Sequence, residues 1–108
     1  MERYDLSVHR GETFRRVLRL KKNGEAIDLT GWTGKAQVRP EPDAEELLCE
    51  MAVEIVPGEG KVVMVIPSEV TAVAPAGVYA WDIRLMDRLD VARYYVGGVF
   101  RVLPSVTK

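Results

Sequence analysis

The chain has 108 residues, a length that fits one domain with a single hydrophobic core. Its residues are 47% hydrophobic and 29% charged, and the formal net charge of −1 gives no overall attraction to nucleic acid or to an acidic membrane surface. No run of about 18 apolar residues is present, so the sequence predicts no membrane span. The N-terminal residues do not form a signal-peptide pattern, and we expect the chain to stay in the cytoplasm of the cell that makes it.

Alternating apolar residues predict short β-strands along almost the whole chain. We expect strands at residues 4–9, 14–20, 32–39, 47–55, 61–66, 78–86, 91–96 and 99–103. Asn23-Gly24 is a strong hairpin signal, and Gly97-Gly98 indicates a bulge or a bend. One short helical turn is expected near 68–73, with Ser68 as its cap. The seven or eight strands predict an all-β fold, an Ig-like antiparallel β-sandwich that spans residues 1–108 as one domain.

The segment from Ala76 to Leu85 has the clearest strand pattern, because its large apolar side chains fall on alternate positions. Gly77 followed by Tyr79 is typical of a tyrosine corner, in which the phenol hydroxyl bonds back to the backbone across the sandwich. Small residues at positions 34 and 36 leave room for a large neighbour such as Trp81. The expected structural core includes Phe14, Trp32, Tyr79, Trp81 and Ile83.

Side chains that carry chemistry do not form a recognisable catalytic or metal-binding pattern. His9 is the only histidine, and Asp5 and Ser7 are expected beside it on a solvated strand face rather than in a catalytic arrangement. Cys49 is the only cysteine, which excludes an internal disulfide, and we expect a buried, inert thiol whose pKa is raised by nearby acidic residues. The acidic stretch 41–46 lacks the spacing of a calcium loop. We therefore expect no enzyme, no catalytic residue, no metal and no cofactor.

Charge is distributed unevenly along the chain. Residues 1–22 contain seven Arg and Lys against three acids, whereas residues 41–59 contain seven acids and no Arg or Lys. One interpretation is that both segments are simply solvated surfaces. The other is that they are complementary patches that bring subunits together. In that second case, the expected interface residues are Arg15, Arg16, Val17, Arg19, Glu45, Glu46, Glu50, Tyr94 and Tyr95.

A series of turn and strand motifs occurs in a recognisable order. It consists of Arg10-Gly11-Glu12-Thr13-Phe14, Asn23-Gly24, Asp28-Leu29-Thr30-Gly31-Trp32, Ala36-Gln37-Val38-Arg39, Gly60-Lys61-Val62, Ala76-Gly77-Val78-Tyr79-Ala80-Trp81-Asp82-Ile83 and Gly97-Gly98-Val99-Phe100-Arg101-Val102. This order resembles small phage and prophage structural proteins with an Ig-like fold. It is similar to the N-terminal domain of siphophage baseplate upper proteins over about residues 4–103.

The resemblance implies a structural role without catalysis in the tail, baseplate or head–tail region of a virion. Such a protein is assembled in the cytoplasm of the bacterial host. It implies contacts with other virion proteins and with further copies of the same chain, and it implies neither a nucleic-acid nor a membrane partner.

A second interpretation is a β-sandwich module that binds a small ligand or a carbohydrate. Tyr94 and Tyr95 are adjacent, so one of the two side chains must face outward, and Trp32 begins a strand beside a loop. Exposed aromatic side chains are typical of sugar sites. An enzyme would need a polar pocket with a perturbed acid or base, and the sequence offers no candidate.

Overall fold

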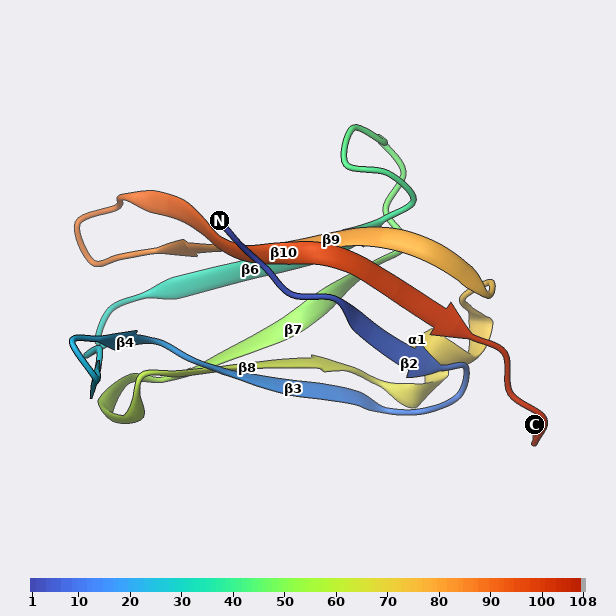
Figure 1. Ribbon diagram of the computed structural model, residues 1–108, viewed down its shortest axis with the longest axis horizontal. Coiled ribbons are helices and arrows are strands. Elements are labelled where there is room, and N and C mark those ends of the chain that lie inside the picture. The colour runs from blue at the N-terminus through green and yellow to red at the C-terminus, as the bar shows by residue number, and fades with distance from the viewer. Residues whose placement is uncertain (108) are drawn as a thin grey trace.

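The computed structural model describes residues 1–107 as two packed layers of β-strands with overall extents of 43 × 28 × 20 Å (Figure 1). The strands are β1 (Glu2–Arg3), β2 (Leu6–His9), β3 (Phe14–Arg19), β4 (Lys21–Lys22), β5 (Glu25–Ala26), β6 (Thr33–Arg39), β7 (Cys49–Val56), β8 (Lys61–Ile66), β9 (Gly77–Met86) and β10 (Ala92–Leu103). The helical segments are the 3-10 turn η1 (Pro57–Glu59) and the helix α1 (Ser68–Val73). The all-β sandwich with one short helix, predicted from the sequence, is confirmed.

A single eight-stranded sheet folds over to make both layers. Its strand order is β1-β10-β9-β6-β7-β8-β3, and β2 also pairs with β10. β7 turns the corner, because its first residues pair with β6 while residues 52–56 pair with β8. We call β10, β9 and β6 the upper layer and β8, β3 and the second half of β7 the lower layer (Figure 1). β1 and β2 are counted with the upper layer because both pair with β10. The hairpin β4-β5 forms a separate sheet.

The N-terminal segment differs from a simple antiparallel arrangement. β1 and β2 both pair with β10 in the parallel direction. The predicted strand 4–9 begins only at Leu6, because Tyr4 and Asp5 form an interruption between β1 and β2. At the interruption the Trp81 indole Nε1 donates to the Tyr4 carbonyl at 2.8 Å, and Val99 N donates to the Asp5 carboxylate at 3.0 Å. These two bonds attach the N-terminal segment to β9 and β10.

β10 is one continuous strand rather than the two that were expected. The irregularity lies between Tyr94 and Val96, where the register with β9 shifts, and not at the two glycines. Gly97 and Gly98 permit close backbone approach instead. A Cβ at position 97 would lie 2.9 Å from the Trp81 carbonyl oxygen, and one at position 98 would lie 2.7 Å from the Asp5 carboxylate.

The core lies between the two layers. Phe14 from the lower layer meets Phe100 from the upper layer edge to face, with ring centroids 5.2 Å apart. Of the other residues expected in the core, Trp81 and Ile83 are buried, whereas Trp32 and Tyr79 are half-buried and pack against it. Aliphatic side chains from both layers fill the rest of this interior.

The space at position 34 is not used by Trp81 as expected. A Cβ on Gly34 would lie 2.9 Å from both Leu85 and Val53, so these two side chains occupy the space. Leu85 is directly opposite Gly34 in the β6–β9 register, whereas Trp81 is opposite Val38. The prediction of Trp81 was wrong because the residues opposite positions 34 and 36 are Leu85 and Ile83.

Local turn chemistry largely follows the sequence. Asn23 and Gly24 both have positive φ, as a two-residue hairpin turn requires. The Tyr79 hydroxyl donates to the Pro75 carbonyl at 2.6 Å, within the corner that leads into β9 rather than across the sandwich. Ser68 makes no capping bond; Pro67 occupies the N-cap position of α1. A different residue, Thr71, anchors the helix, because its buried hydroxyl accepts from Gly11 N and donates to the Glu12 carbonyl.

Candidate interaction surfaces

The outer face of the lower layer combines cations with valines. Alternation along β3 directs Arg15, Val17 and Arg19 outward, and the register places them opposite residues of β8. We call this surface the valine face; it consists of Arg15, Val17, Arg19, Lys61, Val63 and Val65. Val63 is buried, with 5% of its surface exposed, and Val17 and Val65 are half-buried. The valine face is therefore a largely covered apolar strip bordered by three cations, of which Arg15 and Arg19 are exposed.

Residues 61–66 are nearly all apolar, a pattern that favours a central strand covered on both faces. β8 is central within its layer, since it pairs with both β7 and β3. Its inward residues reach the core, and on its outer face Val63 is buried and Val65 is half-buried. The expectation from the hydrophobic run is therefore largely confirmed.

Arg16 lies elsewhere than predicted. It shares the inward side of β3 with Phe14 and Leu18, and its guanidinium sits 5.6 Å from the centroid of the Phe14 ring. Its Nε is buried and has no hydrogen-bond partner within residues 1–107. The β3–β8 register is continuous, so no bulge accommodates Arg16. Arg16 therefore packs against the core edge and does not belong to the exposed valine face.

β3 also forms a border of the folded sheet. It pairs with β8 on one side and with no strand of residues 1–107 on the other. Beside this border is an open groove of about 310 Å³ between β3 and the start of the chain. Its lining residues are Glu2, Tyr4, Val17, Leu18, Arg19, Leu20 and Val96. An unpaired strand border with apolar side chains beside it is a suitable place for contact with another chain.

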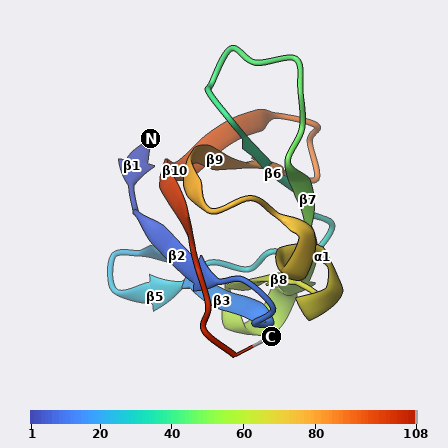
Figure 2. The same cartoon turned by 90° about the vertical axis from the view of Figure 1, so that its right-hand side faces the viewer.

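The acidic segment forms a loop that projects from the upper layer, between β6 and β7 (Figures 1 and 2). Arg39 organises it, because its Nη1 donates to the carbonyls of Ala44, Glu45 and Glu46 at 3.2, 2.9 and 3.2 Å. The acidic side chains of the loop remain exposed, and Leu47 beside them is 43% exposed. We call residues 41–47 the acidic loop. The role of Arg39 in the loop could not be predicted from the sequence, because an arginine at the end of a strand is not a pattern that indicates hydrogen bonds to a loop.

The acidic and basic patches do not meet within one molecule. In Figure 2 the acidic loop projects from one side and β3 lies on the opposite side. The ion pairs found within residues 1–107 are Arg3–Asp5, His9–Glu12 and Lys61–Glu59. The third predicted acid, Glu50, lies outside the loop, on β7 opposite Gln37. The charges of Arg15, Arg19, Glu45 and Glu46 are thus available to a second molecule.

Tyr94 and Tyr95 point to different sides, as alternation along a strand predicts for adjacent residues. The Tyr94 side chain is 54% exposed on the outer face of the upper layer. Tyr95 packs against the core beside Trp32, with ring centroids 6.0 Å apart. Of Trp32, Tyr94 and Tyr95, Tyr94 is therefore the exposed aromatic, and Trp32 serves packing.

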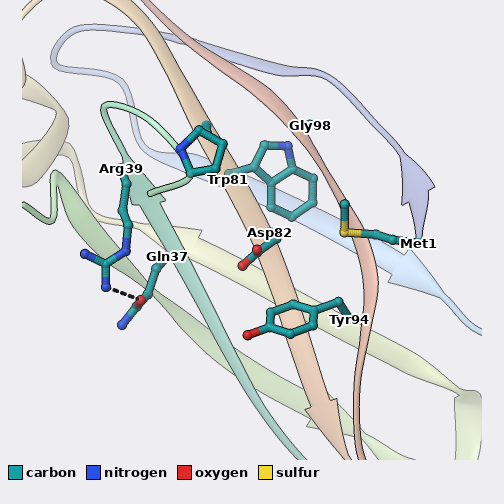
Figure 3. Close-up of a pocket in the computed structure, with 9 residues that line it drawn as sticks. Met1, Gln37, Arg39, Trp81, Asp82, Tyr94 and Gly98 are labelled. Carbon is teal, nitrogen blue, oxygen red and sulfur yellow. Dashed lines mark hydrogen bonds between the residues drawn. The ribbon is translucent and has the colours of Figure 1, made fainter. Parts of the chain in front are cut away.

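Tyr94 borders a groove of about 410 Å³ on that outer face (Figure 3). We call it the Tyr94 groove; its lining residues are Met1, Gln37, Arg39, Pro42, Ala80, Trp81, Asp82, Tyr94 and Gly98. Burial raises the pKa of the half-buried Asp82 carboxyl, and the nearby guanidinium groups of Arg39 and Arg84 oppose this effect. An acid with a perturbed pKa beside a cavity is a feature that the sequence did not reveal.

The remaining candidate side chains, Cys49, Asp5, Ser7 and His9, do not form a catalytic or metal-binding group within residues 1–107. Cys49 is half-buried, and burial alone raises the pKa of its thiol, so the neighbouring acids are not the cause. Asp5, Ser7 and His9 are exposed, and the Asp5 carboxylate binds Val99 N. Residues 1–107 contain no group of three or more His, Cys, Asp or Glu side chains arranged to hold a metal ion. Across the same part of the chain, α-helices of membrane-spanning length and hydropathy are absent.

Comparisons with known proteins give a likeness of fold. No family model and no curated protein sequence matches the chain. The crystal structure of CopC from Methylosinus trichosporium OB3b is similar with a TM-score of 0.57 at 12% identity, over 96% of this chain and 88% of that one. The N-terminal domain of phage TP901-1 ORF48 aligns with a TM-score of 0.48 at 12% identity, over 97% of this chain and 99% of that domain. At this identity the likeness to CopC shows a shared β-sandwich architecture.

Proposed function

We propose that the chain is a structural protein of a phage or prophage virion that acts through contacts between subunits. The order of turn and strand motifs supports the virion context. The observation that carries the assembly role is the unpaired border strand β3, on which the exposed Arg15 and Arg19 flank the half-buried Val17. A border strand without a neighbour can pair with or pack against a second chain, and a partner with acidic and apolar groups matches this one.

A second copy of the chain offers such a partner in its acidic loop. The loop presents exposed acids together with the exposed apolar side chain of Leu47. Acids match the cations of the valine face, and Leu47 matches its valines. Because the loop and the face are different surfaces on opposite sides of the molecule, the contact is head to tail and forms a ring or a filament.

A charge exchange between the two surfaces tests this contact. The first variant is Arg15→Glu/Arg19→Glu, and the second is Glu45→Arg/Glu46→Arg. We expect the wild type to self-associate at about 10 µM to 1 mM, in the affinity range of weak contacts, and each variant alone to remain monomeric in sedimentation velocity. An equimolar mixture of the two variants should assemble again, because each face then meets a loop of opposite charge. Low salt should strengthen all of these effects.

The matched control is Arg93→Glu/Arg101→Glu, which changes the net charge equally at two exposed positions of β10. It should assemble as the wild type does. A wild type that stays monomeric over the whole concentration range, or a mixture of the two variants that fails to assemble, would contradict contact between copies.

The virion role itself is tested with the products of the neighbouring genes. Co-expression with those products should yield a complex that purifies through either partner, and Arg15→Glu/Arg19→Glu should weaken it. Neighbours that encode capsid, terminase or tape-measure proteins would fit the proposal. Neighbours that encode a metabolic pathway, with no complex on co-expression, would argue against it.

A further inference from the structure

The floor of the Tyr94 groove includes a position with a short side chain. Ala80 and Asp82 lie on alternate positions of β9 and both line the groove, and Ala80 carries only a methyl group. Gly98 of β10 also belongs to the lining, and Figure 3 shows Tyr94 beside Asp82. The groove measures about 410 Å³, and a smaller hollow of about 130 Å³ adjoins it at Asp82. Volumes of this order suit a small ligand.

A hydrogen-bond acceptor and a donor stand side by side on the groove floor. Gln37 and Asp82 are directly opposite in the β6–β9 register. The Asp82 carboxylate accepts no hydrogen bond from residues 1–107, although it is half-buried. The Gln37 carbonyl oxygen accepts from Arg39 at 2.9 Å, which leaves its amide nitrogen as a donor. Two adjacent hydroxyl groups satisfy this pair, one donating to Asp82 and the other accepting from Gln37.

Tyr94 adds an aromatic surface at the rim. Its side chain is 54% exposed, and Figure 3 shows the ring beside Asp82 with its hydroxyl end toward the groove. An exposed ring can cover the apolar face of a ligand while its hydroxyl bonds a polar edge. Lys35, Arg39 and Arg84 lie around the site and attract an anion, whereas the Asp82 carboxylate repels one at the floor, so phosphate needs its own arm in the test. A neutral polyhydroxyl compound can bond Asp82 and Gln37 together, which a phosphate cannot do without charge repulsion from Asp82.

We propose that the Tyr94 groove binds a saccharide, with a vicinal diol held by Asp82 and Gln37 and a sugar ring stacked on Tyr94. This binding site is separate from the valine face and goes beyond the assembly role. The groove borders the acidic loop through Pro42, so the glycan contact lies beside one of the two assembly surfaces and away from the other, the valine face.

The test is a titration followed by NMR of the indole N–H groups. The chain has two tryptophans, so the indole N–H region of the spectrum contains two side-chain signals. Trp81 lines the groove, whereas Trp32 packs beside Tyr95. Glucose, galactose, mannose, rhamnose and N-acetylglucosamine are the probes, with inorganic phosphate as a separate arm. We expect at least one saccharide to shift the Trp81 signal while the Trp32 signal stays in place.

Variants locate the binding to the proposed groups. Asp82→Asn and Tyr94→Ala should each weaken saccharide binding by about tenfold or more, the factor that 1.4 kcal/mol represents. Tyr94→Phe should retain binding, because it keeps the ring. Glu54→Gln, which removes one acid from an exposed position of β7, is the matched control for Asp82→Asn and should bind as the wild type does. Ala80→Leu should abolish binding by filling the floor.

Three results would overturn the saccharide site. These are the absence of a Trp81 shift with every saccharide, shifts that persist in both Asp82→Asn and Tyr94→Ala, and a response to inorganic phosphate in place of the saccharides. The titration is repeated with Arg15→Glu/Arg19→Glu, whose assembly surface is altered. Binding retained in that variant shows that the groove acts independently of assembly, and a shared loss would place the Trp81 response at the subunit contact instead.

Discussion

The two borders of the folded sheet are built in different ways. At one border the N-terminal segment lies along β10, where the Asp5 carboxylate accepts from Val99 N and the Tyr4 carbonyl accepts from the Trp81 indole. At the other border β3 has no neighbouring strand within residues 1–107 and presents Arg15 and Arg19 outward. The first border is closed by the chain itself, and the second is left open with charges on it. Substitutions at the first should therefore change stability, and substitutions at the second should change association.

The largest effect on stability is expected from Gly98→Ala at the closed border. A Cβ there would lie 2.7 Å from the Asp5 carboxylate and 3.0 Å from the Tyr4 carbonyl oxygen, and the latter is backbone that cannot swing away. The N-terminal segment must move off β10 and lose its hydrogen bonds. We expect the free energy of unfolding to fall by about 2–3 kcal/mol, measured by urea denaturation.

Gly58→Ala is the matched control for that substitution. Nothing lies within 4 Å of a Cβ at position 58, and the residue has no positive φ. Its effect should stay within about 0.5 kcal/mol of the wild type. Equal losses in the two variants would mean that the N-terminal segment is not held closely against β10.

A smaller, pH-dependent effect is expected from Asp5→Asn. The hydrogen bond from Val99 N, followed by the bond from Arg3, holds the pKa of the Asp5 carboxyl below its ordinary value of 3.8. A carboxyl with a lowered pKa in the folded state stabilises the fold above the ordinary value, and this contribution is lost as pH falls through the folded-state pKa. The asparagine still accepts from Val99 N but does not titrate.

The measurement is urea denaturation of both proteins between neutral pH and about pH 2, which brackets the acidic titration range. The wild type should lose more stability on acidification than Asp5→Asn does. Asp28, whose carboxyl pKa is also lowered by its bonds to Thr30, is present in both and cancels in the comparison. Parallel pH profiles would mean that Asp5 contributes no charge-dependent stability at this border.

The features that sequence predicted well are those that short segments determine. The Asn23-Gly24 hairpin needs only two residues with positive φ, and the Tyr79 corner needs a partner four residues away. The parallel pairing of β1 and β2 with β10 joins opposite ends of the chain, so local pattern does not contain it. The hydrogen bonds from Arg39 to the carbonyls of the acidic loop likewise depend on how the loop folds back.

Arg16 shows a different limit. Arg16 was expected at the interface with Arg15 and Arg19, whereas alternation along β3 places it with Phe14 and Leu18. Near a sheet border, the long side chain can lie over an aromatic ring while its head reaches outward. The Tyr94 groove was missed because its lining comes from Met1, β6, the acidic loop, β9 and β10, which only the fold brings together.

The smallest effect on stability is expected from Arg15→Glu/Arg19→Glu at the open border. Both side chains are exposed, and Arg19 lies directly opposite Lys61, a like-charged pair that weakens the sheet slightly. Charge reversal at Arg19 turns this pair into an attractive one. The free energy of unfolding should therefore stay within about 0.5 kcal/mol of the wild type or rise by a few tenths, by urea denaturation of dilute protein. Cations that the fold does not need for stability point to a use outside the monomer, whereas a clear loss of stability would return β3 to the role of an ordinary structural strand.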